Sequence, residues 1–246
     1  MADLKLTSSR ALAVAILSWF CVSADSIGHA AMGGAATLLK IDVTSPANGS
    51  SRLWQGQVAY SITAAYDGKS TRFGEIQPND VVLETRYVSD VAMASKVGRM
   101  LPTALNTISQ SNCAGCHDFE AGGAGPSYAA IGARYSGTPA AAATLALHIT
   151  RGSSGVWGSS AMPPHPDVTA AQARVAADWI IGHGNDAGVH YYLGNTGSFR
   201  MIPAERPGPR AGIVATAFYT GPLRPGDTHR TGTGADRVVV MGLAHH

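Results

Sequence analysis

Two cysteines and a histidine form the most distinctive group of reactive side chains in this sequence. Cys113, Cys116 and His117 lie together in the pentapeptide CAGCH. Two cysteines separated by two residues and followed directly by a histidine are the attachment pattern of a c-type haem. Each thiol adds to one vinyl group of the porphyrin, and the histidine binds the iron from one face. The pentapeptide therefore predicts one covalently bound haem c (iron) per chain.

A haem held in this way needs a sixth ligand, and Met162 in the stretch SAMPP (160–164) offers one. A thioether opposite a histidine raises the reduction potential and leaves no open position for a substrate, which is typical of an electron carrier. A methionine by itself is more often core filler than a ligand. We therefore predict His117 and Met162 as the metal ligands and expect an electron carrier rather than an enzyme.

Two other sites for a C-x-x-C pair stay open as alternatives. Structural zinc takes two such pairs or a histidine pair at fixed spacing. No cysteine follows Cys116, and the later histidines lack that spacing. A thioredoxin-like dithiol would follow a strand, whereas a helical pattern precedes this pair. His148 is an alternative sixth ligand to Met162, and His165 is expected to be an exposed loop residue.

The composition limits the class of protein and of partner. The chain has 246 residues, a formal charge of +2, 29 glycines and 13 prolines. This length predicts one to three domains. The balanced charge gives no indication of nucleic acid as a partner, and the short apolar runs favour a loop-rich soluble protein.

The N-terminus has the pattern of an export signal. Lys5 and Arg10 precede the apolar stretch 11–22, and small residues follow it. This predicts a signal peptide over residues 1–30 and a periplasmic or secreted protein. An uncleaved anchor is the alternative. If the signal is removed, Cys21 leaves with it, and both remaining cysteines belong to the haem.

The residue patterns predict an α+β multidomain chain. Apolar residues alternate with polar ones in 36–98 and again in 187–246, as strands require. Helical spacing fills 99–186. Each β segment alone makes a poor core. We therefore expect residues 36–98 and 187–246 to form one β-sandwich in which the helical unit is inserted. The alternative is two separate β units that flank the helical unit.

The predicted helices have recognisable ends. Leu101, Leu105 and Ile108 share one face ahead of CAGCH, and Tyr128, Ile131 and Tyr135 share another. Thr138 and Pro139 are expected to begin the next helix and Gly152 to end it. A capping box at 169–172 begins the last helix. This helix is expected to run to about Ile181, with Val175 and Trp179 on its apolar face.

The region from Leu101 to His183 resembles the small bacterial mono-haem class I c-type cytochromes. The motifs that carry the resemblance are CAGCH (113–117), GPSY (125–128), GVWG (155–158) and MPP (162–164). The resemblance implies thioether bonds at both cysteines and an axial role for Met162. It also implies that the carbonyl of Pro126 accepts a hydrogen bond from His117 and that the indole of Trp157 reaches a haem propionate; core packing is the alternative for Trp157.

The β segments carry the stretch IDVTSP (41–46) and a strand pattern over 81–87. In these two features they resemble immunoglobulin-like modules that accompany cytochrome units in secreted bacterial sugar dehydrogenases. This implies a redox partner protein, with a dehydrogenase or a carbohydrate as a further partner through the β region. Two other functions stay open. One is a haem peroxidase in which Met162 leaves the iron. The other is a carbohydrate-binding module with an accessory haem, for which Trp54, Tyr191 and Tyr192 would be the platforms if they are exposed.

Overall fold

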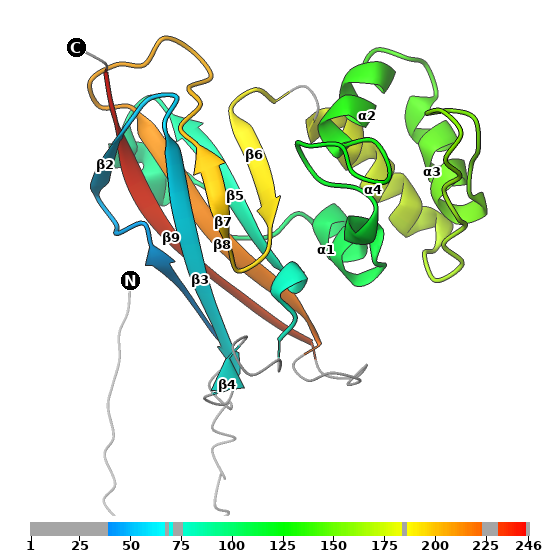
Figure 1. Ribbon diagram of the computed structural model, residues 1–246, viewed down its shortest axis with the longest axis horizontal. Helices are drawn as coiled ribbons and strands as arrows, with labels where there is room; N and C mark the ends of the chain where they lie inside the picture. The colour runs from blue at the N-terminus through cyan, green and yellow to red at the C-terminus, as the bar shows by residue number, and fades with distance from the viewer. Residues whose placement is uncertain (1–38, 67–68, 71–75, 184–185, 223–230, 245–246) are drawn as a thin grey trace, which may run out of the picture. The chain divides into compact units, whose positions relative to one another are not determined.

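The computed structural model describes residues 39–66, 69–70, 76–183, 186–222 and 231–244 (Figure 1). The predicted signal peptide, residues 1–30, lies outside the described residues. Within them, no helix has the length and apolar character needed to cross a membrane.

The strands form two sheets. The first contains β1 (Leu39–Ser45), β3 (Gln57–Tyr66), β4 (Lys69–Ser70) and β7 (Thr196–Arg200). The second has the order β2 (Ser50–Leu53), β9 (Thr231–Leu243), β8 (Gly212–Pro222), β5 (Val81–Val88) and β6 (Val189–Leu193). Apolar side chains of both sheets, such as Ile62, Leu83 and Val240, share one core. Alternate residues of a strand point to one face, so each strand can supply every second side chain to this core.

Strands from before and after the helices pair with each other. β3 pairs antiparallel with β7, and β5 pairs antiparallel with both β6 and β8. The helical segment leaves the sheet after β5 and returns at β6, where Arg86 lies opposite Val189. Neighbouring strands thus bring the two ends of the segment together, as an insertion requires. The domain boundaries given above stay a prediction.

Among the described residues, the helical segment contains four α-helices. Two short 3-10 helices lie within this segment or next to it, and a third precedes β5. The helices are α1 (Thr103–Gln110), α2 (Tyr128–Tyr135), α3 (Ala141–Arg151) and α4 (Ala170–His183). The 3-10 helices are η2 (Pro78–Asp80), η3 (Val91–Lys96) and η4 (Cys113–Gly115). α4 packs against the other three helices. A second core joins these helices to β5 and β6 through residues such as Leu105, Phe119 and Tyr191.

The helix ends follow the sequence in part. The capping box of α4 is present, since Thr169 and Gln172 exchange hydrogen bonds at 3.0 and 3.3 Å. The predicted start of α3 at Thr138 is wrong: the helix begins at Ala141, because Ala140 has φ = +58° and the preceding residues form a turn. α4 runs to His183, and Val175 is 44 % exposed rather than on the apolar face.

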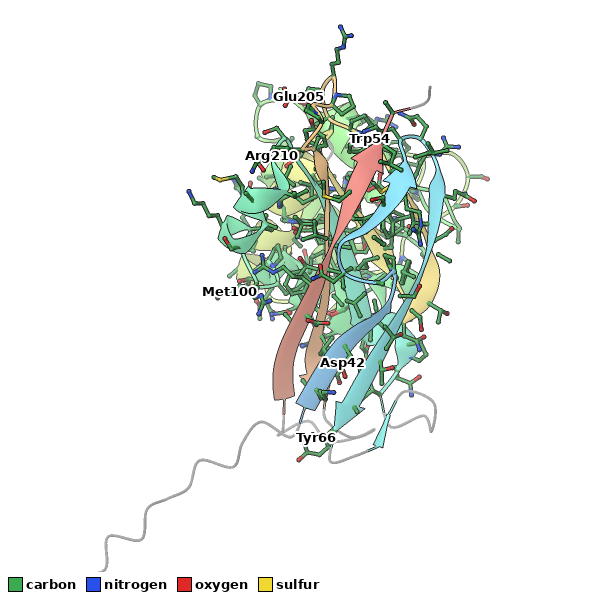
Figure 2. The ribbon with its side chains drawn as sticks, turned by 90° about the vertical axis from the view of Figure 1, so that its left-hand side faces the viewer. Asp42, Trp54, Tyr66, Met100, Glu205 and Arg210 are labelled. Carbon is green, nitrogen blue, oxygen red and sulfur yellow. The ribbon has the colours of Figure 1, made fainter. Side chains whose placement is uncertain are left out.

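The predicted aromatic platforms are mostly buried. Trp54, which is labelled in Figure 2, is 6 % exposed. Its ring centroid lies 5.9 Å from that of Tyr87. Tyr191 is 4 % exposed and donates a hydrogen bond from its hydroxyl to Glu84 at 2.8 Å. Tyr192 is partly buried against the sheet core. Sequence alternation does not separate a core face from a ligand-binding face, because both place aromatic residues at every second position.

Candidate functional site

The residues with predicted chemical roles surround one cavity in the helical segment. The cavity has a volume of about 750 Å³, and it is lined by the CAGCH stretch, the 123–128 loop, α3 and the 153–163 loop. Cys113, Cys116, His117, Pro126, Trp157 and Met162 all belong to its lining. Two segments about forty residues apart in the chain, 113–117 and 153–163, therefore meet at one site.

Both thiols are free to react. Cys113 is partly buried, Cys116 is exposed, and no disulfide joins them. Burial, with a smaller contribution from the nearby Asp167, raises the pKa of the Cys113 thiol to about 11. The structure thus holds Cys113 as a neutral thiol at the wall of the cavity.

The ring of His117 has a defined orientation. Its Nδ1 lies 2.7 Å from the carbonyl oxygen of Pro126. A carbonyl can only accept a hydrogen bond, so Nδ1 carries the proton and Nε2 keeps its lone pair for a metal. The ring also stacks on Tyr128, with 5.5 Å between centroids. The prediction of the Pro126 contact came from the family resemblance, and the structure contains that contact.

The absence of a side chain at Gly125 leaves room for the ring of His117. A Cβ atom at residue 125 would lie 2.6 Å from Cε1 and 2.9 Å from Nδ1 of His117, closer than real contacts. We expect Gly125→Ala to rotate the ring and to lower the free energy of unfolding by about 1–3 kcal/mol, a typical penalty for overpacking. Denaturant titration of the purified holoprotein measures this loss. Gly122→Ala is the control, because its Cβ would meet nothing within 4 Å; equal stability of the two variants would contradict the prediction.

Met162 is held by a short backbone pairing at the end of α3. Its N–H donates to Ser153 at 2.8 Å, and its carbonyl accepts from Ser153 at 3.0 Å. Gly152, with φ = +78°, ends the helix where a Cβ would lie 2.7 Å from the Met162 carbonyl oxygen. The two prolines that follow restrict the backbone further. These contacts place the methionine at the cavity wall.

Trp157 lies at the edge of the cavity rather than in a core. It is 37 % exposed, and the guanidinium carbon of Arg134 lies 4.5 Å from the centre of its ring. Arg134 also donates to the carbonyl of Val156 at 2.9 Å. The core-packing alternative for Trp157 is therefore wrong. Its predicted contact with a propionate stays a prediction.

Two further histidines belong to this site, and one of them, His148, is the alternative sixth ligand that the sequence indicated. His148 and His165 both line the cavity. His165 lies in a loop, as predicted, but it is only partly exposed, and its N–H donates to the carbonyl of Ile149 of α3 at 3.0 Å. That backbone bond folds the proline-rich loop onto the helix, which the local sequence does not predict.

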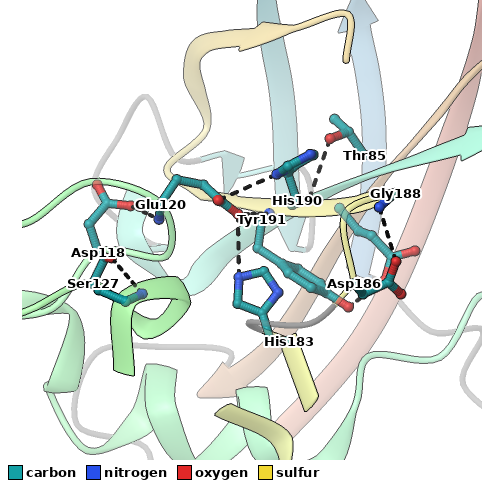
Figure 3. A network of polar contacts seen from close by, with 11 residues as sticks. Thr85, Asp118, Glu120, Ser127, His183, Asp186, Gly188, His190 and Tyr191 are labelled. Carbon is teal, nitrogen blue, oxygen red and sulfur yellow. Dashed lines mark hydrogen bonds and ion pairs between the residues drawn. The ribbon is translucent and has the colours of Figure 1, made fainter. Parts of the chain in front are cut away.

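A polar cluster next to the cavity was not predicted. Glu120 lies 3.3 Å from Nε2 of His183 and 3.3 Å from Nδ1 of His190 (Figure 3). Burial raises the pKa of Glu120, but its close contacts with the imidazoles of His183 and His190 outweigh that effect and lower it to about 2. The hydrogen bond with Glu120 raises the pKa of His190. Among the described residues, no three metal-ligating side chains are arranged to hold an ion.

The residues around the cavity fit a c-type haem. Two unpaired thiols, an imidazole with a free Nε2 and a thioether line one largely apolar cavity. A glycine stands where a side chain would displace the imidazole. This donor set is that of a haem bound by two thioethers, histidine and methionine.

Comparison with known proteins agrees with this chemistry. A family model described as cytochrome C oxidase, cbb3-type, subunit III, matches residues 101–180. Cytochrome c-552 of Hydrogenobacter thermophilus is 46 % identical over 72 residues, which are 29 % of this chain and 72 % of that protein. This chain belongs to the class I c-type cytochromes. As a member of this family it carries haem c and serves electron transfer, so it also requires a redox partner.

Two further relatives each match only part of this chain. Cytochrome c-551 of Stutzerimonas stutzeri is 45 % identical over 69 residues, 28 % of this chain and 65 % of that protein. The crystal structure of cytochrome c552 from Nitrosomonas europaea matches with 42 % identity, covering 31 % of this chain and 95 % of that one, with a TM-score of 0.31. The family model matches residues 101–180, so the β strands described above lie outside the matched region.

Proposed function

We propose that the protein is a periplasmic or secreted mono-haem cytochrome that transfers single electrons with both axial ligands retained. The observation that supports this proposal is the shared cavity, at which His117 with a free Nε2 and Met162 both lie. When bound, haem c supplies a reversible change between Fe(II) and Fe(III). Two protein ligands leave no open coordination position, which favours electron transfer over catalysis at the iron.

Each site residue has a role in this proposal. Cys113 and Cys116 form the thioether bonds, and His117 and Met162 bind the iron. Pro126 accepts the Nδ1–H of His117, which keeps Nε2 directed at the metal, as outer-sphere groups do at metal sites. The indole of Trp157, at the cavity edge, donates a hydrogen bond to a propionate.

The peroxidase and carbohydrate alternatives receive less support. A peroxidase would need Met162 to leave, yet two backbone hydrogen bonds hold this residue to Ser153. Carbohydrate platforms would need exposed aromatic rings, yet Trp54 and Tyr191 are buried. We assign the β strands the role of a companion module, resembling immunoglobulin-like modules, that serves a partner such as a dehydrogenase. The N-terminal signal peptide belongs to the same proposal.

Haem content and redox behaviour test the function. The protein exported from a host that matures c-type cytochromes should have a mass increased by one haem, and its redox titration should follow a one-electron Nernst curve. The ferrous form should bind carbon monoxide slowly or not at all. Rapid binding of carbon monoxide would indicate an open position and would favour the peroxidase alternative. A chain without haem would contradict the proposal.

Docking of the redox partner is expected to depend little on charge. The segment 101–185 contains three arginines, four acidic residues and no lysine, a formal charge of −1. Ala161, Pro163 and Trp157 form an exposed, largely apolar rim at the cavity, and the exposed Pro164 follows in the same loop. We expect electron self-exchange between ferrous and ferric copies, measured by NMR line broadening, to change less than about threefold between low and high salt, because steering requires a strong patch of one sign. A tenfold or larger change would contradict docking through this rim.

A further inference from the structure

The loop that follows the haem-binding histidine is covered by the β sheet. Phe119 is fully buried, and its ring lies 5.5 Å from Tyr191 of β6 and 5.9 Å from Trp179 of α4, measured between centroids. Tyr191 is itself held by its hydrogen bond to Glu84 of β5. This loop is therefore packed between the helical segment and the second sheet.

The carboxylate of Glu120 makes the polar contacts of this interface. Oε1 lies 3.3 Å from Nε2 of His183 and accepts the backbone N–H of Tyr191 at 3.4 Å. Oε2 lies 3.3 Å from Nδ1 of His190. One side chain thus joins the haem loop to the end of α4 and to β6, as Figure 3 shows. We call these contacts the Glu120 clamp.

The clamped loop is connected to the axial histidine through α2. The carbonyls of Asp118 and Phe119 accept the N–H groups of Tyr128 and Ala129, each at 3.0 Å. Tyr128 in turn stacks on the His117 ring. A displacement of residues 118–120 would therefore shift the ring that supports His117.

We propose that Glu120 is a positioning residue for the haem, and that through this clamp the β sheet forms part of the haem site. The proposal rests on the electron-carrier function given above. His183 and His190 both lie outside the stretch 101–180 that matches the family model. The clamp thus joins Glu120, which lies within the matched stretch, to residues beyond it.

Loosening the clamp would open the loop that holds the buried ring of Phe119 and would let water reach the histidine side of the haem site. The surroundings of a metal site set its solvent access and dielectric, and with them its reduction potential. Water admitted to this side would stabilise the ferric form, which carries one more positive charge, and would lower the potential. A looser loop would also let the His117 ring change its orientation.

A double variant separates positioning from charge. Glu120→Ala/His190→Ala removes one acidic and one basic group. At about pH 6 the raised pKa of His190 keeps its imidazole protonated, so the formal charge of the protein is unchanged by the double substitution. The control is Arg174→Ala/Asp178→Ala, which removes an exposed ion pair of 3.0 Å from α4 with the same charge balance. The three holoproteins are compared in their midpoint potentials and in the hyperfine-shifted NMR resonances of the axial histidine.

We expect the double variant to keep one haem, to have a lower midpoint potential than the wild type, and to show shifted His117 resonances. The control should match the wild type in midpoint potential and in these resonances. A double variant that only melts at lower temperature, with potential and resonances unchanged, would show that the clamp is merely structural and would overturn the proposal. If the double variant yields no soluble protein, Glu120→Gln/His190→Gln, which keeps the same charge balance and more of the side-chain volume, carries the same test. Failure of the electron-carrier function would be seen separately, because the wild type would then lack haem or its one-electron titration.

Discussion

Replacing Met162 with alanine is expected to abolish the charge-transfer band between the thioether sulfur and the ferric iron. The reduction potential should fall by on the order of 0.1 V or more, within the range of about 0.8 V over which axial ligands set haem potentials. The physical reason is that the thioether sulfur favours Fe(II), whereas its replacement by water or a nitrogen base favours Fe(III). Visible spectra of both oxidation states and a potentiometric titration measure the two effects.

The chain offers a matched control for this substitution. Met100 is 88 % exposed and lies outside the cavity lining (Figure 2), so Met100→Ala should leave the band and the potential unchanged. A wild-type spectrum that lacks this band and is unchanged in Met162→Ala would show that Met162 is not the sixth ligand. His148 and His165 line the same cavity and would be the next residues to replace.

Phe119→Ala is expected to lower the free energy of unfolding by about 3–5 kcal/mol, the usual cost of removing a large buried aromatic side chain. Phe119 is fully buried and contacts Tyr128, Trp179, His183 and Tyr191. Truncation leaves a cavity between the helices and β6 that these rings cannot fill without moving. This loss is a large part of the roughly 5–15 kcal/mol by which proteins are stable. Chemical denaturation of the holoprotein, followed by circular dichroism, measures it.

Val175→Ala on α4 is the control for this experiment. Its side chain is 44 % exposed, and surface substitutions usually change stability by less than about 0.5 kcal/mol. Phe119→Leu should lie between the two, since it keeps most of the apolar volume. A cost below about 1 kcal/mol for Phe119→Ala would mean that the helical segment does not depend on its packing against the sheet.

Local patterns in the sequence predicted local structure well. The capping box at Thr169 and Gln172 is present because both partners lie within one helical turn. The start of α3 was wrong because the left-handed conformation of Ala140 depends on the preceding turn. β6 was not recognised as a separate strand, since its five residues form an edge whose partner, β5, lies about a hundred residues earlier.

The sequence by itself determined the haem attachment, because thioether chemistry requires two cysteines and a histidine at a spacing that can be read along the chain. Only the tertiary structure decided which distant residues share a site. It brought Met162, His148 and His165 to the cavity of CAGCH, and it joined Glu120 to His183 and His190. It also buried Trp54 and Tyr191. These contacts depend on strand register and helix packing between residues far apart in the chain, and no spacing along the sequence encodes them directly.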